Sequence, residues 1–206
     1  MNKLVSEIYP VSRETLERFK LLYNGVLQWQ AKTNLISNAT KDEIWERHIA
    51  DSLQCIAIKP EAETWVDIGS GGGFPGLVIA AIMAELPDSD VQLVESNNKK
   101  CAFLRQMNRQ MRANAQIHNE RIESAAKRIK TPEIVTARAL AALPKLLELS
   151  SPWLQNGAVG LFHKGREFEA ELEECNGLWR FDLVKHESRI SQDSVILEIR
   201  NLQSAT

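Results

Sequence analysis

The stretch Thr64-Trp65-Val66-Asp67-Ile68-Gly69-Ser70-Gly71-Gly72-Gly73-Phe74-Pro75-Gly76 decides the fold. Its first five residues predict a buried strand, and the apolar run that follows predicts a helix from Gly76 to Glu85. Glycines between the two let the backbone turn sharply and let a ligand approach without meeting a Cβ atom. A helix start offers free N–H groups, and the carboxyl ends of parallel strands form a ligand crevice. We therefore expect this turn to bind a nucleoside-bearing ligand.

The spacing of the glycines favours one class of cofactor over two others. A dinucleotide fingerprint that started at Gly69 would need a glycine where Phe74 stands. A phosphate-binding P-loop would need a Gly-Lys-Ser/Thr sequence, which does not follow here. The arrangement of Gly69, Gly71 and Gly73, with Asp67 two residues ahead, resembles motif I of the S-adenosylmethionine-dependent methyltransferases.

An acid at the end of the next predicted strand, Val91–Glu95, supports this interpretation. Glu95 stands where a carboxylate can accept hydrogen bonds from both ribose hydroxyls of an adenosyl group, as strand-end acids do in dinucleotide folds. The glycine turn together with this acid is more specific than glycines alone. The alternatives are a turn that serves structure only and an acid that merely faces solvent.

Beyond the turn, short apolar runs alternate with helical stretches, which predicts a parallel sheet covered on both faces. The last two predicted strands alternate apolar and polar residues, as antiparallel strands near a sheet edge do. The predicted strands are 64–68, 91–95, 116–119, 133–137, 158–163, 179–185 and 194–200. The predicted helices between them are 76–85, 99–114, 143–153 and 166–175. We expect an α/β, Rossmann-like class I methyltransferase fold with a seven-stranded, mostly parallel sheet.

The first sixty residues predict two amphipathic helices, with an interruption at Asn34–Asn38. Ser12 can cap an amphipathic helix, and Thr40-Lys-Asp-Glu43 resembles a capping box ahead of a second one. The joint with the α/β part falls near residues 59–63. We expect a single domain over residues 1–206, composed of a helical extension (1–60) and a Rossmann-like core (61–206).

Composition narrows the class of protein. The 206 residues are 44% hydrophobic and 25% charged, as in an ordinary globular chain. No apolar run approaches the roughly 20 residues of a membrane span, and the N-terminus lacks the apolar stretch of a signal peptide, so we expect a cytoplasmic protein. The three cysteines and four histidines are scattered, which argues against disulfides and a metal site.

Charge is concentrated in one block. Residues 97–130 contain nine Lys and Arg residues against two Glu residues, whereas the whole chain has a net charge of −2. Arg105, Arg109 and Arg112 recur at helical spacing, with Lys99 and Lys100 one turn earlier. Such a block suits contact with a polyanion. A solvated helix face is the alternative.

Several further stretches together resemble the glucose-inhibited division protein B family of small-subunit ribosomal RNA guanine-N7 methyltransferases. These stretches are Lys32–Ser37, Arg47–Leu53, Val66–Gly76, Leu93–Ser96, Phe103–Arg105, Arg138-Ala139 and Lys164-Gly165. The likeness covers roughly residues 15–165. The chain departs from the family pattern at Glu95, where Asp is common, and at His163, where an aliphatic residue is usual.

The resemblance implies methyl transfer from S-adenosyl-L-methionine to N7 of the guanine usually designated 527 in 16S rRNA. It also implies that the cofactor contacts six residues, namely Gly69, Phe74, Glu95, Ile122, Glu123 and Arg138. The partner would be 16S rRNA or the small ribosomal subunit. We expect the protein itself to be a monomer. Guanine N7 carries a lone pair and no proton, so positioning can replace a general base and no catalytic residue is named.

Two further basic residues have two interpretations each. Arg47 and Asp51 could form a surface ion pair at i, i+4, or their helix could border the pocket, as the family likeness suggests. Lys164 could face the target RNA or simply solvent. Two other functions also remain open: a methyltransferase for a small molecule or protein, which would leave the basic block unexplained, and a non-catalytic binding protein that kept the fold.

Overall fold

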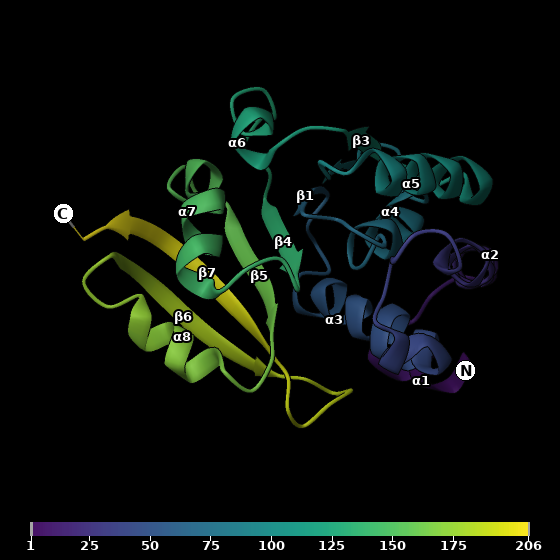
Figure 1. Cartoon of the computed structure of the whole chain (residues 1–206), viewed down its shortest axis with the longest axis horizontal. Helices are drawn as coiled ribbons and strands as arrows, with labels where there is room; N and C mark the ends of the chain where they lie inside the picture. Colours follow the sequence, from purple (N-terminus) through teal and green to yellow (C-terminus); the bar gives the residue numbers. More distant parts are fainter. Residues whose placement is uncertain (1, 206) are drawn as a thin grey trace.

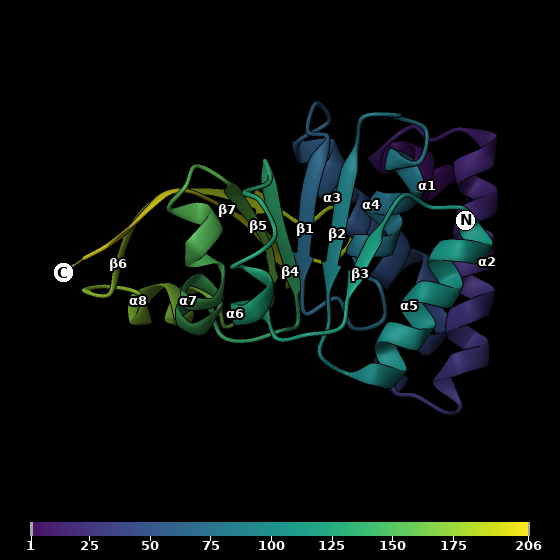
Figure 2. The same ribbon diagram turned by 90° about the horizontal axis from the view of Figure 1, so that it is seen from above.

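The computed structural model describes residues 2–205 and contains one seven-stranded sheet in the order β3-β2-β1-β4-β5-β7-β6 (Figures 1 and 2). The strands are β1 (Thr64–Ile68), β2 (Asp90–Val94), β3 (Gln116–His118), β4 (Ile134–Arg138), β5 (Val159–Lys164), β6 (Trp179–Glu187) and β7 (Val195–Ser204). β1 to β5 are mutually parallel, and β7 is antiparallel to both β5 and β6. The predicted fold, with seven strands and an antiparallel pair at one edge, is confirmed.

Helices cover both faces of the sheet because the strands alternate their buried side chains. Trp65 of β1 packs with the helices on one face, whereas Val66 and Ile68 pack with those on the other. The first face carries α2 (Arg13–Gln30), α3 (Asp51–Ile58), α4 (Gly76–Met83) and α5 (Asn98–Met111). The second face carries α6 (Ile122–Ala125), α7 (Leu143–Leu154) and α8 (Phe168–Glu174).

The helical extension packs on the first face, where α2 runs beside α5 (Figure 2). As predicted, the Ser12 side chain caps α2 by accepting a hydrogen bond from the Thr15 amide at 2.9 Å. A short helix that we did not predict, α1 (Asn2–Ile8), precedes it.

The predicted capping box at Thr40–Glu43 is wrong. Ser37 instead caps a 3₁₀ helix, η1 (Asn38–Glu43), and a π-helix, η2 (Ile44–Ala50), leads into α3. The Thr40 hydroxyl contacts the ring of His48 at 2.8 Å, so it is engaged in a tertiary contact and not in a cap.

Some helices and strands end at other residues than predicted, because helix caps and pairing within the hairpin determine where they end. α5 stops at Met111 because Arg112 adopts a left-handed conformation, with φ of 49°. β6 and β7 are longer than predicted because they pair along their whole length, from Glu187 and Val195 beside the loop to Trp179 and Ser204 at the open end. Over residues 2–205, no helix has the length and apolarity of a membrane span, and no cluster of side chains could hold a metal ion.

Candidate functional site

The glycine turn joins β1 to α4 at the carboxyl edge of the sheet. Gly69, Gly71 and Gly73 all have positive φ (67°, 53° and 84°), which L side chains rarely adopt. The amides of Gly69 and Ser70 both donate to the carbonyl of Val94 at the end of β2. The turn is thereby held against the next strand, with its backbone facing the crevice.

Asp67 supports the turn from beneath. Its side chain is buried and accepts hydrogen bonds from the Gly76 amide at 3.2 Å and the Thr136 hydroxyl at 2.8 Å. Burial raises the pKa of Asp67 to about 6, against the lowering effect of these hydrogen bonds. Asp67 and Gly73, two predicted cofactor residues, line neither of the two cavities beside the turn that are described below. In this structure they support the conformation of the turn.

Glu95, directly after β2, lies against the glycine turn. One carboxylate oxygen accepts from the Gly71 amide at 2.9 Å and the other from the Asn97 amide at 2.7 Å. Glu95 lines a cavity of about 380 Å³ together with the predicted pair Ile122 and Glu123. The structure thus brings the turn, the strand-end acid and this pair to one place.

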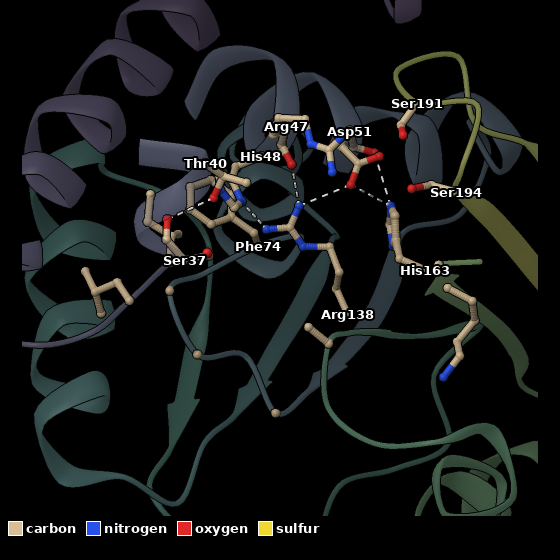
Figure 3. Close-up of a pocket in the computed structure, with 18 of the residues that line it drawn as sticks. Ser37, Thr40, Arg47, His48, Asp51, Phe74, Arg138, His163, Ser191 and Ser194 are labelled. Carbon is tan, nitrogen blue, oxygen red and sulfur yellow. Dashed lines mark hydrogen bonds and ion pairs between the residues drawn. The ribbon is translucent and has the colours of Figure 1, made fainter. Parts of the chain in front are cut away.

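A second cavity, of about 720 Å³, adjoins the first (Figure 3). Gly69, Lys100 and Ala139 line both, so the two cavities adjoin at the turn. Phe74 and Arg138, two further predicted cofactor contacts, line the larger one. Ala139 has a φ of 53°, an uncommon conformation for a residue other than glycine, at the point where the cavities meet.

Arg138 is the centre of the larger cavity's wall (Figure 3). Its guanidinium donates to the carbonyl of Arg47 at 2.8 Å, to the carboxylate of Asp51 at 3.1 Å and to Nδ1 of His48. It also lies 5.4 Å from the centre of the Phe74 ring. One residue of the core therefore binds three residues of the helical extension.

These hydrogen bonds determine the state of His48. A guanidinium can only donate, so Nδ1 is the acceptor and the proton is on Nε2, which faces Thr40. Burial and the charge of Arg138 lower the pKa of His48 to about 3. His48 is therefore a neutral, packed histidine.

Of the two interpretations of Arg47 and Asp51, the surface ion pair is not what the structure shows, because the carboxylate of Asp51 binds Arg138. The alternative is what the structure shows: Arg47, His48 and Asp51 all border the larger cavity. His163, the unusual residue of β5, directs Nε2 to the carbonyl of Asp51 at 3.2 Å and so joins the same wall.

Lys164 is not a solvent-facing lysine. Its side chain is 8% exposed, forms an ion pair with Glu171 and donates to the carbonyl of Ala141 at 3.0 Å. It lines the larger cavity, where any contact with a ligand would compete with these partners.

The remaining predicted RNA contacts lie on α5. Its buried face packs on the extension through Phe103, Leu104, Met107 and Met111. Lys99, Arg105 and Arg109 are exposed, and Lys100 is half-buried beside the turn. Arg112 stands one residue past the helix end, so the predicted shared helical face holds for Arg105 and Arg109 only.

Sequence reasoning missed two loops that wall the larger cavity. One is residues 34–37 of the extension, and the other, residues 188–194, joins β6 to β7. Neither carries a glycine or charge pattern that marks a site. The available signals were two glutamines, Gln30 and Gln54, whose side chains hold the backbones of these loops.

Comparison with known proteins identifies the family. The model of the GidB family, described as rRNA small subunit methyltransferase G, matches residues 15–199. The ribosomal RNA small subunit methyltransferase G of Brucella ovis is 48% identical over 95% of this chain and 92% of its own length. The protein of that name from Chelativorans sp. is 47% identical over 94% and 92%.

A solved methyltransferase structure from Geobacter sulfurreducens superposes with a TM-score of 0.56 over 87% of both chains, at 16% identity. That likeness concerns the fold alone and agrees with the predicted Rossmann-like methyltransferase architecture. The extent of the family match and the identity to full-length relatives lead to one conclusion: the chain belongs to the GidB family of ribosomal RNA small subunit methyltransferases.

Proposed function

We propose that this enzyme transfers the methyl group of S-adenosyl-L-methionine to N7 of a guanine in 16S rRNA, the one usually designated 527. The observation that carries the proposal is the contact of Glu95 with the Gly71 amide where two cavities adjoin. Bacterial 16S rRNA as substrate would place the enzyme in the cytoplasm, and we propose that it acts as a monomer.

The residues present fit an adenosyl cofactor. The Glu95 carboxylate uses one hydrogen bond per oxygen, which leaves lone pairs for two ribose hydroxyls. Ile122, Leu140 and Leu149 give the smaller cavity apolar lining for an adenine ring. A Cβ on Gly69 would lie 2.5 Å from the Leu140 side chain, so the turn and this lining are in close contact.

The larger cavity suits the methionine end of the cofactor and the acceptor base. A volume of about 720 Å³ lies in the range of pockets that enclose drug-sized ligands. Bound S-adenosyl-L-methionine supplies an electrophilic methyl group, and guanine N7 supplies a lone pair without losing a proton. The protein then has to align the two, and such alignment can contribute several kcal/mol of barrier reduction.

The exposed cations of α5 fit this substrate. Lys and Arg contacts with phosphates position RNA and make its binding depend on salt. We assign this role to Lys99, Arg105 and Arg109, with Arg47 at the cavity rim.

The test is transfer of a labelled methyl group to small ribosomal subunits, and separately to free 16S RNA, from cells that lack the enzyme. The product is mapped by cleavage at N7-methylguanine. We expect a single modified guanine, lost in the Glu95→Ala and Gly71→Arg variants and retained in Glu14→Ala, whose side chain is exposed on α2. Binding of the cofactor without transfer to either RNA would overturn the assignment in favour of another acceptor.

A further inference from the structure

The polar side chains that line the larger cavity fall into two groups. Most are already hydrogen-bonded within the protein: Ser37, Thr40, His48, Asp51, Arg138, Lys164 and Glu171. Arg47, Lys100 and Glu167 line the cavity without a side-chain hydrogen bond among the described residues, and Nδ1 of His163 is buried without a partner. The hydroxyls of Ser191 and Ser194 belong to this second group. They line the cavity, and among residues 2–205 no side chain or backbone group bonds to either hydroxyl.

These two serines come from the loop that joins β6 to β7, far along the chain from the glycine turn. In Figure 3 they lie on the side of the cavity opposite Ser37 and Thr40, with Asp51 and Arg138 between. Both are half-buried, so they are accessible from the cavity without being on the open surface.

The loop is held in place by a buried residue of the extension. Gln54, 4% exposed, accepts a hydrogen bond from the Arg189 amide at 2.7 Å and donates to the Ser188 hydroxyl at 3.2 Å. The Ser188 hydroxyl in turn accepts from the amides of Ile190 and Ser191. Ser191 is therefore presented by an ordered backbone.

Gln54 also connects this loop to the Arg138 wall. Its amide donates to the Asp51 carboxylate at 2.9 Å, and Asp51 binds Arg138. A line of hydrogen bonds thus runs from the hairpin loop through α3 to the end of β4. The wall around Arg138 and the loop that carries the serines are therefore held together by the side chains of Asp51 and Gln54.

We propose that Ser191 and Ser194 bind the target guanosine and position its base for methyl transfer, an inference that rests on the proposed function. When N7 faces the methyl group, the guanine edge that carries N1–H and the 2-amino group points away from the glycine turn. Hydroxyls at the far side can accept from these donors and can donate to a neighbouring ribose. A base reached in this way must be turned out of its stack, as other enzymes that act on bases require.

The experiment measures methyl transfer to the accepted RNA substrate and, in parallel, the affinity for S-adenosyl-L-methionine. The variants are Ser191→Ala with Ser194→Ala, and Ser194→Phe, which fills the far side of the cavity. The control is Gln192→Ala, in the same loop but exposed and outside the cavity lining.

We expect the double alanine variant to lower kcat/KM for RNA by about tenfold, the scale of one or two neutral hydrogen bonds, with cofactor affinity within about twofold of wild type. Ser194→Phe should abolish transfer while still binding the cofactor, and Gln192→Ala should match wild type. Replacement of the target guanine by inosine, which lacks the 2-amino group, should lower kcat/KM for the RNA more in wild type than in the double variant.

Two failures are distinguishable. If wild type methylates the RNA and the serine variants do so equally well, the inference is wrong and the proposed function stands. If wild type binds the cofactor and methylates neither RNA, the proposed function itself fails. A loss of cofactor affinity that accounts for the whole effect in the serine variants would also overturn the inference.

Discussion

Nδ1 of His48, in the helical extension, accepts a hydrogen bond from the guanidinium of Arg138, at the end of β4. This contact joins the two parts of the chain in the wall of the larger cavity. It also keeps the imidazole neutral well below the ordinary histidine range. We therefore expect His48 to contribute to a loss of stability in mild acid.

His48 should make the protein sensitive to acid. With a pKa of about 3 when folded and about 6.5 when unfolded, its contribution is full above pH 6.5 and is lost as the pH falls toward 3. The free energy of unfolding should fall by up to about 1.4 kcal/mol per pH unit in that window from this group. Urea denaturation of wild type and of His48→Gln at several pH values isolates the contribution of His48, because the other titrating groups are common to both proteins. An equal slope for the two proteins would contradict the prediction.

Gly72→Ala should disturb the turn through its contact with the extension. A Cβ at this position would lie 2.8 Å from the backbone oxygen of Leu35, which cannot move without shifting the loop at 34–37. We expect a loss of about 1 to 3 kcal/mol in unfolding free energy, as for other overpacked sites, and weaker cofactor binding. Gly165→Ala is the matched control for stability, since its Cβ would meet nothing within 4 Å. Denaturant unfolding and cofactor titration check both.

Arg105→Ala with Arg109→Ala should weaken RNA binding and leave cofactor affinity unchanged, because both side chains project from the outer face of α5. For each phosphate that is no longer neutralised, the slope of log affinity against log salt should become shallower by about 0.7 to 0.9. Filter binding of 16S RNA at several salt concentrations measures this slope. Arg13→Ala, at the exposed start of α2, serves as control. An unchanged slope would favour the solvated-face interpretation of α5.

Glu198→Gln should destabilise the fold by about 3 kcal/mol at neutral pH, because it breaks a buried ion pair. The Glu198 side chain is 2% exposed and binds Lys59 at 2.7 Å and His186 at 2.8 Å. Burial alone would raise the pKa of Glu198, but the hydrogen bonds from Lys59, His186 and Arg200 lower it to about 2.

The stabilising effect of Glu198 is therefore complete above about pH 4.5 and is lost as the pH falls toward 2. The difference between wild type and Glu198→Gln in thermal unfolding should shrink over that range. Glu173→Gln, exposed on α8, should show no difference at any pH.

Removal of residues 1–60 should leave a core that aggregates. The apolar face of α5, including Phe103, Leu104 and Met107, would lose its cover from α2. Fragment 61–206 should bind a hydrophobic dye and show no cooperative unfolding, whereas removal of residues 1–10 should be tolerated much better. A soluble, cooperatively folding fragment would instead mean that the extension is a separate unit.

The fold could be predicted from the sequence because its signals are local. The apolar run of β1, the glycines after it and Glu95 lie within about thirty residues, and together they favour one fold. The exposed cations of α5 could likewise be named from spacing alone. Helix ends and the 3₁₀ and π segments could not, because tertiary contacts such as Thr40 with His48 override local capping preferences.

The sequence alone predicted the turn at Gly69–Gly73 and the acid beside it, since positive φ angles favour glycine and the order of the strands brings Glu95 against the turn. Only the tertiary structure decided what surrounds the other end of the cavity. Arg138, His48 and Asp51 meet there across some ninety residues of sequence, and Ser191 and Ser194 arrive from a hairpin still further along. The reason is physical: backbone propensities act between neighbours in sequence, whereas hydrogen bonds and burial act between neighbours in space.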